Sequence, residues 1–436
     1  MGRGHIHNPQ GSLMRIFALV DCNNFYVSCE RLFRPELKTS PVVVLSNNDG
    51  CVIARSQEAK NLNIPMGAPA YKYKNFFLHH GVEIFSSNYA LYGDLSQRVT
   101  ASLASITPDL EVYSIDESFL EFPPCMLREL PSIGREIRER ILKWTGIPVS
   151  VGFGETKTQA KLAASFAKKH KQTGRTFSLC GRNDMDRLLE RVPVTDIWGI
   201  GRRHGKKLTA RGVNTARAFR DLPNLWLKKN MSITGLHTAF ELRGTPCFEL
   251  DNTPQPKKSI SSSRSFGRPV STLTDLEESV ATYVARAGEK LREQNSLTGG
   301  VMAYLTTNRF NNLPQYSNSA THMFSIATDY TPELIRIAQS CIRSIYKEGY
   351  SYKKTGVVLL DLCGKYNRQC NLLELEREDN PVKKDKLMNL LDATNSRFGR
   401  QTLSYASEGI EQPWQMNRKF KSPAYTTCWD ELPSIG

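Results

Sequence analysis

The sequence lacks several features that would place the chain in common classes of protein. It contains no run of about 18 apolar residues, so we expect no membrane-spanning helix and no membrane partner. Its ten cysteines include no Cys-x-x-Cys pair, which argues against a zinc ribbon. Several of the cysteines lie in apolar runs, and we expect these to be small core residues. No secretory signal is recognisable, so we expect the protein to lie in a reducing cytoplasm. Gly152-x-Gly154 lacks the rest of a dinucleotide-binding or P-loop fingerprint, and both are rejected.

Acidic residues are also scarce relative to basic ones. The chain has 43 Asp and Glu against 58 Lys and Arg, which gives a formal net charge of +15. This surplus favours a polyanionic partner, although solubility alone accounts for part of it. A hydrophobic content of 40% and a charged content of 23% are those of a globular protein. The 436 residues are too many for one core and predict about two to four domains.

Three carboxylates carry the most information about chemistry. Asp21 ends the apolar run 16–20, while Asp116 and Glu117 lie within the run 112–120. Both runs are too short and too rich in β-branched or aromatic residues for a helix, so each predicts a buried β-strand. A buried acid is costly unless its charge is compensated, and hard divalent cations prefer carboxylate oxygens. Convergence of the three would form a two-metal site suited to phosphoryl transfer. Either site alone is explained more simply by surface acids at strand ends. An Asp-Glu pair in a hairpin turn is a further alternative for Asp116 and Glu117, which the presence of Asp21 disfavours.

The rest of the chain predicts alternating helices and strands. We expect a strand at 41–45 and a turn at 46–50. A small helix should follow at 56–62, and the segment 65–69, which contains proline and glycine, terminates it. Further on, helices at 132–145 and 156–170 flank a strand at 148–154. Lys157, Lys161 and Lys168 share one face of the helix at 156–170, and a solvated lysine face is the usual meaning of that pattern.

The second half of the chain predicts a helical region and then a mixed domain. Residues 184–243 are helical, and a proline- and lysine-containing linker follows at 254–258. The order then is strand 259–266, helix 276–294, strands 300–308 and 320–326, helix 332–349 and strand 355–362. This βαββαβ order matches the split β-α-β pattern. Residues 364–436 show no clear periodicity, so no fold is predicted for them. Met14 is an alternative start position to Met1.

Several motifs, taken in order, resemble those of the Y-family (translesion) DNA polymerases. They are the segments 21–30, 46–55, 85–89, 113–117 and 198–203. Within that family they look like the UmuC-like branch, which includes the catalytic subunit of DNA polymerase V and its plasmid-borne relatives. The resemblance extends from about Phe17 over nearly the whole chain.

The resemblance implies an α+β multidomain fold of the right-hand polymerase type. Its parts would be a disordered tail (1–14), a palm (15–30 and 81–183), small fingers (31–80), a helical thumb with a helix-hairpin-helix (184–243), a linker (244–258), a βαββαβ little finger (259–363) and a C-terminal extension (364–436).

It further implies an error-prone, template-directed DNA polymerase subunit that inserts deoxynucleotides opposite damaged bases during SOS mutagenesis. Two Mg²⁺ ions would be held by Asp21, Asp116 and Glu117. The nucleotide site would contain Phe25, the steric gate Tyr26, Ile53 above the nascent base pair, and the triphosphate-binding Lys60 and Lys168. Tyr26 and Ile53 also fit plain core positions. Gln57 stands where many relatives carry tyrosine, which leaves the phosphate contacts of the fingers less defined.

The thumb motif predicts contact with the DNA backbone. Glycines of a hairpin let its N–H groups approach a phosphate without reading sequence. The residues are Gly199, Gly201, Arg202, Arg203, Lys206 and Lys207. An ordinary helical hairpin is the alternative, and the basic flanks favour DNA.

Resemblance also supplies the expected partners. Gln369, Leu372 and Leu373 are similar to the peptide that docks into a sliding clamp, with Leu373 in place of the usual aromatic. The partners would be primer-template DNA, dNTP, two processed UmuD-type subunits, RecA and the sliding clamp. Two competing functions are a non-catalytic DNA-repair scaffold, which the intact carboxylates oppose, and a palm-type nucleotidyl cyclase, which the thumb and basic surplus oppose.

Overall fold

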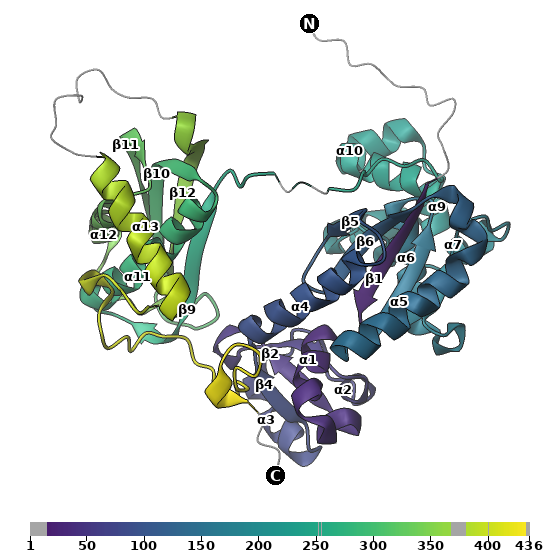
Figure 1. Ribbon diagram of the computed structural model, residues 1–436, viewed down its shortest axis with the longest axis horizontal. Coiled ribbons are helices and arrows are strands. Elements are labelled where there is room, and N and C mark those ends of the chain that lie inside the picture. The colour runs from purple at the N-terminus through teal and green to yellow at the C-terminus, as the bar shows by residue number, and fades with distance from the viewer. Residues whose placement is uncertain (1–14, 252, 254, 368–380, 400, 433–436) are drawn as a thin grey trace, which may run out of the picture. The chain divides into compact units, whose positions relative to one another are not determined.

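The computed structural model describes residues 15–251, 253, 255–367, 381–399 and 401–432, so the tail expected at 1–14 lies outside the described residues. The chain divides into two compact units (Figure 1). Unit 1 comprises Met1–Leu45, Val52–Pro254 and Phe420–Gly436, and unit 2 comprises Ser46–Cys51 and Gln255–Lys419. Apart from the short segment Ser46–Cys51, the chain therefore leaves unit 1 within the expected linker and re-enters it near its C-terminus.

A five-stranded sheet forms the centre of unit 1. Its order is β5 (Leu110–Val112), β6 (Glu117–Phe122), β1 (Ile16–Cys22), β7 (Val149–Gly154) and β8 (Thr176–Ser178). Central β1 is antiparallel to both of its neighbours. Every β1 residue except Asp21 is buried, which confirms the predicted buried strand that ends in an acid.

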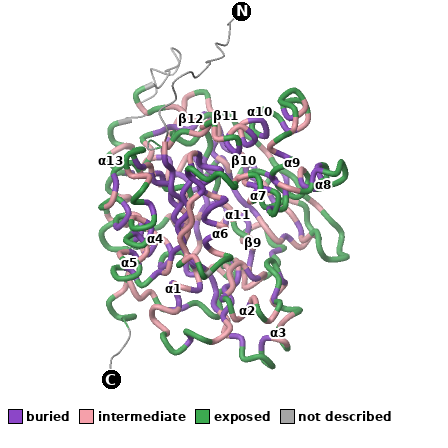
Figure 2. Tube along the Cα trace, turned by 90° about the vertical axis from the view of Figure 1, so that its right-hand side faces the viewer, coloured by how far each residue is buried: buried purple, intermediate pink, exposed green. Residues whose placement is uncertain are grey.

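Alternation along β1 separates its two faces. Ile16, Ala18 and Val20 join a core with α1 (Phe25–Phe33), α4 (Tyr89–Ala104) and α5 (Leu130–Thr145). Phe17 and Leu19 pack against Ala160 and Ala164 of α6 (Lys157–Lys169) instead. Successive side chains of a strand point to opposite faces, so Asp21 shares the α6 face with Phe17 and Leu19. In Figure 2, the buried residues lie mainly along the strands and along the helices that pack on them.

The run 112–120 is not one strand, and that prediction was wrong. β5 ends at Val112 and β6 begins at Glu117, so the run forms a hairpin with Asp116 in its turn. The Ser114 hydroxyl accepts hydrogen bonds from the backbone N–H groups of Asp116 (3.3 Å) and Glu117 (3.1 Å), which closes the turn. The predicted strand at 148–154 and helices at 132–145 and 156–170 are confirmed as β7, α5 and α6.

Gly152 has a packing role in place of a nucleotide-binding one. A Cβ at this position would lie 1.9 Å from the backbone nitrogen of Ala164, so only glycine lets α6 rest directly on β7. This close approach fixes where the lysines of α6 stand relative to Asp21.

A second, three-stranded sheet in unit 1 contains the segment expected to be fingers. Its order is β3 (Val52–Arg55), β2 (Val42–Leu45) and β4 (Glu83–Ser86), with α2 (Gln57–Asn61) and α3 (Ala70–His79) beside it. The strand at 41–45 and the helix at 56–62 are confirmed. β4 pairs in parallel with β2, so this sheet extends past the boundary expected at residue 80.

The helical region predicted at 184–243 is present as four helices. They are α7 (Met185–Glu190), α8 (Arg202–Thr209), α9 (Ala216–Arg220) and α10 (Asn224–Leu242). Glu241 anchors the end of α10 to α6, because its buried carboxylate accepts from the backbone N–H of Thr158 at 2.8 Å. The same carboxylate accepts from the N–H groups of Cys247 (2.7 Å) and Phe248 (3.2 Å), so three segments meet at one buried acid.

Unit 2 has the predicted βαββαβ order. Its antiparallel sheet runs β11 (Ser317–Thr328), β10 (Ser296–Thr307), β12 (Tyr352–Gly364) and β9 (Ile260–Val270). Helices α11 (Leu273–Glu293) and α12 (Thr331–Ile345) share one apolar core with the strands. Among the helices within the described ranges, none is both long and apolar enough to cross a membrane.

The C-terminal region contains a helix that the sequence pattern did not predict. α13 (Pro381–Phe398) buries Met388 but leaves Leu387 and Leu390 exposed, so its apolar residues form no single stripe. Ion pairs of Arg292 with Asp392 (2.6 Å) and of Lys365 with Asp385 (3.0 Å) hold it to the rest of unit 2. Further on, Trp414 enters the unit 2 core, and the described residues from 420 onward belong to unit 1.

Candidate active site

A cavity of about 280 Å³ in unit 1 contains most of the predicted catalytic residues. It lies at the end of β1, between the sheet and α6. Its lining includes Asp21, Glu117, Lys161, Lys168, Asp196 and Trp198. The sheet therefore presents acids, and α6 presents bases, to one small volume.

The sheet register brings two of the three predicted carboxylates face to face. Asp21 of β1 lies directly opposite Glu117 of β6, and directly opposed residues of antiparallel strands share a face. The main chain of Asp116 lies next to β1, where the Cys22 N–H donates to its backbone oxygen at 2.8 Å, but Asp116 is not among the residues that line the cavity.

Each carboxylate has its own polar partner. Lys168 Nζ donates to both oxygens of Asp21, at 2.8 and 2.9 Å, and Lys161 Nζ donates to Glu117 Oε2 at 2.8 Å. The Ser114 hydroxyl donates to Asp116 Oδ1 at 2.7 Å. In this arrangement, no group of three or more His, Cys, Asp or Glu side chains in the described residues could hold a metal ion.

The electrostatics nevertheless fit divalent cations. Burial raises the pKa of Asp21, Lys168 opposes this rise, and the negative charges of Glu117 and Asp116 add to it. Negative charge beside a buried carboxylate such as Asp21 is a setting that Mg²⁺ stabilises, because hard divalent cations prefer carboxylate oxygens. Both neutralising lysines have long, flexible side chains, so they are able to leave the acids without any change in the sheet.

A basic cluster lies next to the acids. Lys60 Nζ donates to Asn24 Oδ1 at 2.6 Å. Burial lowers the pKa of Lys60, and the positive charges of Lys168, Arg55 and Arg175 lower it further, against the opposing effect of Asp21. Cations that repel one another favour an anionic ligand between them. Neither Arg55 nor Arg175 was predicted as a site residue, although Arg55 ends the motif at 46–55.

Tyr26 projects from α1 into an aromatic cluster and is half-buried. Its ring stacks on that of Tyr92, with centroids 4.3 Å apart and an interplanar angle of 15°, and meets Tyr89 edge-on at 6.3 Å. Phe25, one residue earlier, is buried in the core, whereas Ile53 is only partly buried against it. Tyr92 was not predicted as a site residue. The spacing of Tyr89 and Tyr92 could have indicated it, because residues three apart lie on one side of a helix.

The predicted hairpin in the helical region has the expected local geometry. Gly199 adopts a φ of 83°, which glycine tolerates best, and Gly201 is the N-cap of α8. Arg202, Arg203, Lys206 and Lys207 on α8 are all exposed. Lys207 Nζ also donates to the backbone oxygen of Asn230 at 3.1 Å, which leaves the other three as the main candidates for phosphate contact.

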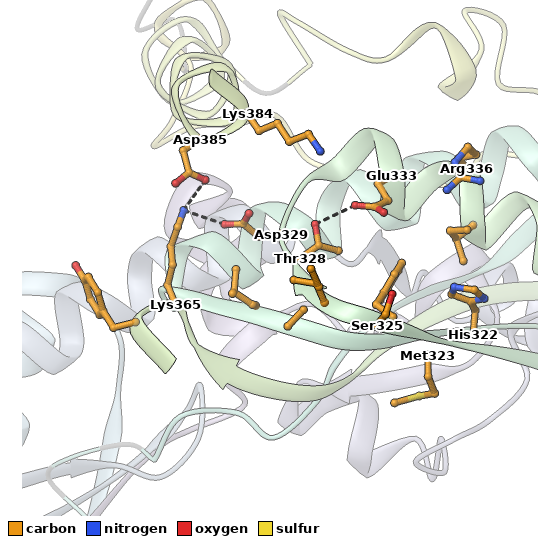
Figure 3. A pocket seen from close by; sticks show the side chains of 16 residues that line it. His322, Met323, Ser325, Thr328, Asp329, Glu333, Arg336, Lys365, Lys384 and Asp385 are labelled. Atoms are coloured by element: carbon orange, nitrogen blue, oxygen red, sulfur yellow. Dashed lines mark hydrogen bonds and ion pairs between the residues drawn. The ribbon is translucent and has the colours of Figure 1, made fainter. Parts of the chain in front are cut away.

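Gln369, Leu372 and Leu373 of the expected clamp peptide lie outside the described residues. Unit 2 has its own cavity of about 930 Å³ among β11, α12 and α13 (Figure 3). At the edge of this cavity, Lys365 Nζ donates hydrogen bonds to Asp329 (3.1 Å) and Asp385 (3.0 Å). The positive charge of Lys365 is therefore offset by two neighbouring acids of the same cavity.

The fold that carries this site is that of the Y-family DNA polymerases. The chain is similar to a Y-family DNA polymerase chimera of Dbh and Dpo4, with a TM-score of 0.64 and 18% identity. The alignment covers 80% of this chain and 99% of that chain.

The chain belongs to the impB/mucB/samB family. The family description matches residues 20–165, its HHH motif matches 182–213 and its C-terminal domain matches 257–372. Protein UmuC of Salmonella typhimurium (strain LT2) is 42% identical over 422 residues, which are 96% of this chain and 99% of that protein. Protein ImpB of Salmonella typhimurium is 39% identical over 425 residues, with the same coverage. Residues 385–435 match a domain of unknown function. The helix-hairpin-helix and the UmuC-like resemblance are therefore confirmed.

Proposed function

We propose that this chain is the catalytic subunit of an error-prone DNA polymerase, and that it inserts deoxynucleotides opposite damaged template bases. The observation that carries the proposal is the pairing of Asp21 with Glu117 across β1 and β6, with Asp116 beside them. The basic cluster around Lys60 supports it, because a triphosphate needs cations next to the acids.

The proposed chemistry is two-metal nucleotidyl transfer. Asp21, Asp116 and Glu117 would hold two Mg²⁺ ions, which when bound activate the primer 3′ hydroxyl and neutralise the triphosphate and leaving pyrophosphate. Ser114 orients Asp116 through its hydroxyl. Lys60 and Lys168 bind the triphosphate oxygens. When the nucleotide enters, Lys168 therefore releases the carboxylate of Asp21 and contacts a phosphate oxygen instead. The free N–H groups at the start of α1 supply further donors for phosphate.

Two other groups would choose and hold the substrates. Tyr26 acts as the steric gate, because its stacked ring would overlap a 2′-OH on the incoming sugar. Ile53 bounds the nascent base pair with a small aliphatic side chain. Gly199, Gly201 and the exposed Arg202, Arg203 and Lys206 of the helix-hairpin-helix bind the DNA backbone without reading its sequence.

The cellular context is part of the same proposal. By family resemblance, the chain works in the cytoplasm with primer-template DNA and dNTP, two processed UmuD-type subunits, RecA and the sliding clamp. The proposed clamp contact is the peptide with Gln369, Leu372 and Leu373.

Primer extension on a template with a single lesion tests the function. The chain, assembled with its proposed partners, should add nucleotides opposite the lesion in a Mg²⁺-dependent reaction. Nucleotide cyclisation without extension would indicate a palm-type cyclase, and DNA binding without either reaction would indicate a scaffold.

A further inference from the structure

The aromatic residue behind Tyr26 is itself held by a buried carboxylate. Tyr92 is fully buried on α4, and its hydroxyl donates to Glu30 Oε1 at 2.6 Å. Glu30 is fully buried on α1, four residues after Tyr26, so one helix carries both the proposed gate and the anchor of the ring behind it. The position of the Tyr26 ring therefore depends on how α1 and α4 are held together.

Residues 420–431, here called the C-terminal brace, join these two helices. Asn88, the N-cap of α4, donates from Nδ2 to Ser422 Oγ at 3.0 Å and to the backbone oxygens of Ser422 and Pro423 at 3.2 Å each. Further along the brace, the ring of Tyr425 stacks on that of Phe33, the last residue of α1, with centroids 4.3 Å apart and an interplanar angle of 12°. The brace thus contacts the start of α4 and the end of α1.

The brace is also fixed to the neighbouring sheet. The backbone N–H of Ser86 in β4 donates to the Phe420 oxygen at 2.9 Å, and the Phe420 N–H donates to Ser86 Oγ at 3.0 Å. Ser422 and Asn88 are both buried, so the contact excludes water. Hydrogen bonds between buried groups are costly to leave unmade, which makes this a built docking site for the segment.

We propose that the C-terminal brace positions the sugar gate. By holding Asn88 at the start of α4 and Phe33 at the end of α1, it keeps Tyr92 stacked behind Tyr26 and limits the room beside the incoming sugar. This gives a role to part of the region that matches a domain of unknown function, and to the motif at 85–89. The inference rests on the proposed function, specifically on Tyr26 as the gate. Asn88, Tyr92 and Tyr425 are positioning residues that act through Tyr26.

The test measures the insertion efficiency, kcat/KM, of matched ribo- and deoxynucleotides by the full-length chain in its active assembly. The variants are Asn88→Ala, Tyr425→Ala and their double variant. Trp429→Ala is the matched control, because Trp429 is an exposed aromatic residue of the same brace. Tyr26→Ala is measured in parallel as the test of the gate.

We expect the brace variants to raise ribonucleotide insertion relative to deoxynucleotide insertion by at least about fivefold, the scale of losing a few hydrogen bonds or a ring stack. Trp429→Ala should leave the ratio unchanged. In the Tyr26→Ala background the brace variants should add nothing, because the residue they act through is gone. Thermal unfolding of each variant shows whether the fold is retained.

The outcomes separate the brace from the gate. If Tyr26→Ala changes the sugar ratio but folded brace variants do not, the brace proposal is overturned and the gate stands. Brace variants that lower both insertions equally, or that change the ratio further in the Tyr26→Ala background, also overturn it. If Tyr26→Ala itself leaves the ratio unchanged, the gate assignment fails and the brace inference fails with it.

Discussion

Asp21 on β1 lies opposite Glu117 on β6, and both side chains face α6, which supplies Lys168 to the first acid and Lys161 to the second. This relationship follows from two simple features of the chain. The period of two along β1 assigns Asp21 to the α6 face, and Gly152 lets α6 approach the sheet closely. The acids and bases of the proposed active site are therefore set by the packing of the core.

The basic cluster predicts a specific defect in nucleotide binding. Lys60→Ala should raise the KM for dNTP by roughly tenfold, since one charge-assisted contact to phosphate is lost while the carboxylates remain. Lys74→Ala is the control, because Lys74 is an exposed lysine on neighbouring α3. Steady-state insertion kinetics measure the effect. An unchanged KM for Lys60→Ala would place the triphosphate elsewhere.

The buried acid Glu241 predicts a large effect on stability. Glu241→Ala should lower the free energy of unfolding by about 3 kcal/mol, because the N–H groups of Thr158, Cys247 and Phe248 lose their acceptor in a buried setting. Urea denaturation measures this, with the exposed Glu129→Ala as control. A loss no larger than that of the control would mean that these N–H groups find other acceptors.

Glu30 predicts a pH-dependent stability difference. Burial raises the pKa of this carboxyl above the ordinary value of 4.5, while Tyr92, Ser422 and Arg34 oppose the rise. The neutral acid is thus favoured in the folded state, so its contribution to stability is present below pH 4.5 and is lost as pH rises through the folded pKa.

Glu30→Gln removes that titration while it keeps an acceptor for Tyr92. The stability of Glu30→Gln relative to the unchanged protein should therefore improve as pH rises from below 4.5 toward neutrality. Denaturant unfolding across this pH range measures the difference. Parallel stability profiles for the two proteins would show that Glu30 ionises in the folded state as easily as in water.

The clamp peptide supports a prediction from sequence alone. Changing Leu372 and Leu373 to Ala should weaken clamp binding by roughly 2–4 kcal/mol, the range for apolar hot spots. Distributive primer extension should continue, while clamp-dependent stimulation should disappear. Stimulation equal to that of the unchanged chain would place the docking site elsewhere.

Local patterns in the sequence predicted local structure well. The buried strand β1, the amphipathic α5 and the βαββαβ order of unit 2 all follow from short-range periodicity. The hairpin around Asp116 was predicted only as the less favoured alternative, because its turn depends on one hydroxyl, that of Ser114, within an apolar run. α13 was missed because its apolar residues do not form one stripe.

The contacts behind the gate could not be predicted, because they join distant parts of the chain. Asn88 and Ser422 are 334 residues apart in sequence, and the short polar segment around Ser422 has no periodicity that would indicate a partner. The carboxylates were identifiable because each follows or interrupts an apolar run. The lysines were identifiable as one helix face, but their pairing with particular acids depends on the packing of α6 against β7.

Primer extension by Asp116→Asn tests most directly whether these carboxylates perform nucleotidyl transfer. Asp109→Asn is the control, because Asp109 is an exposed acid just before β5. The Asn variant keeps the size of the side chain and its place in the turn but removes the charge that the proposed chemistry needs. The extension rate of Asp116→Asn should fall by at least about a hundredfold, the usual scale for losing one such electrostatic contribution, while DNA binding remains near normal. Asp109→Asn should extend primers at the unchanged rate. Near-normal extension by a folded Asp116→Asn would show that nucleotidyl transfer does not depend on this group of carboxylates.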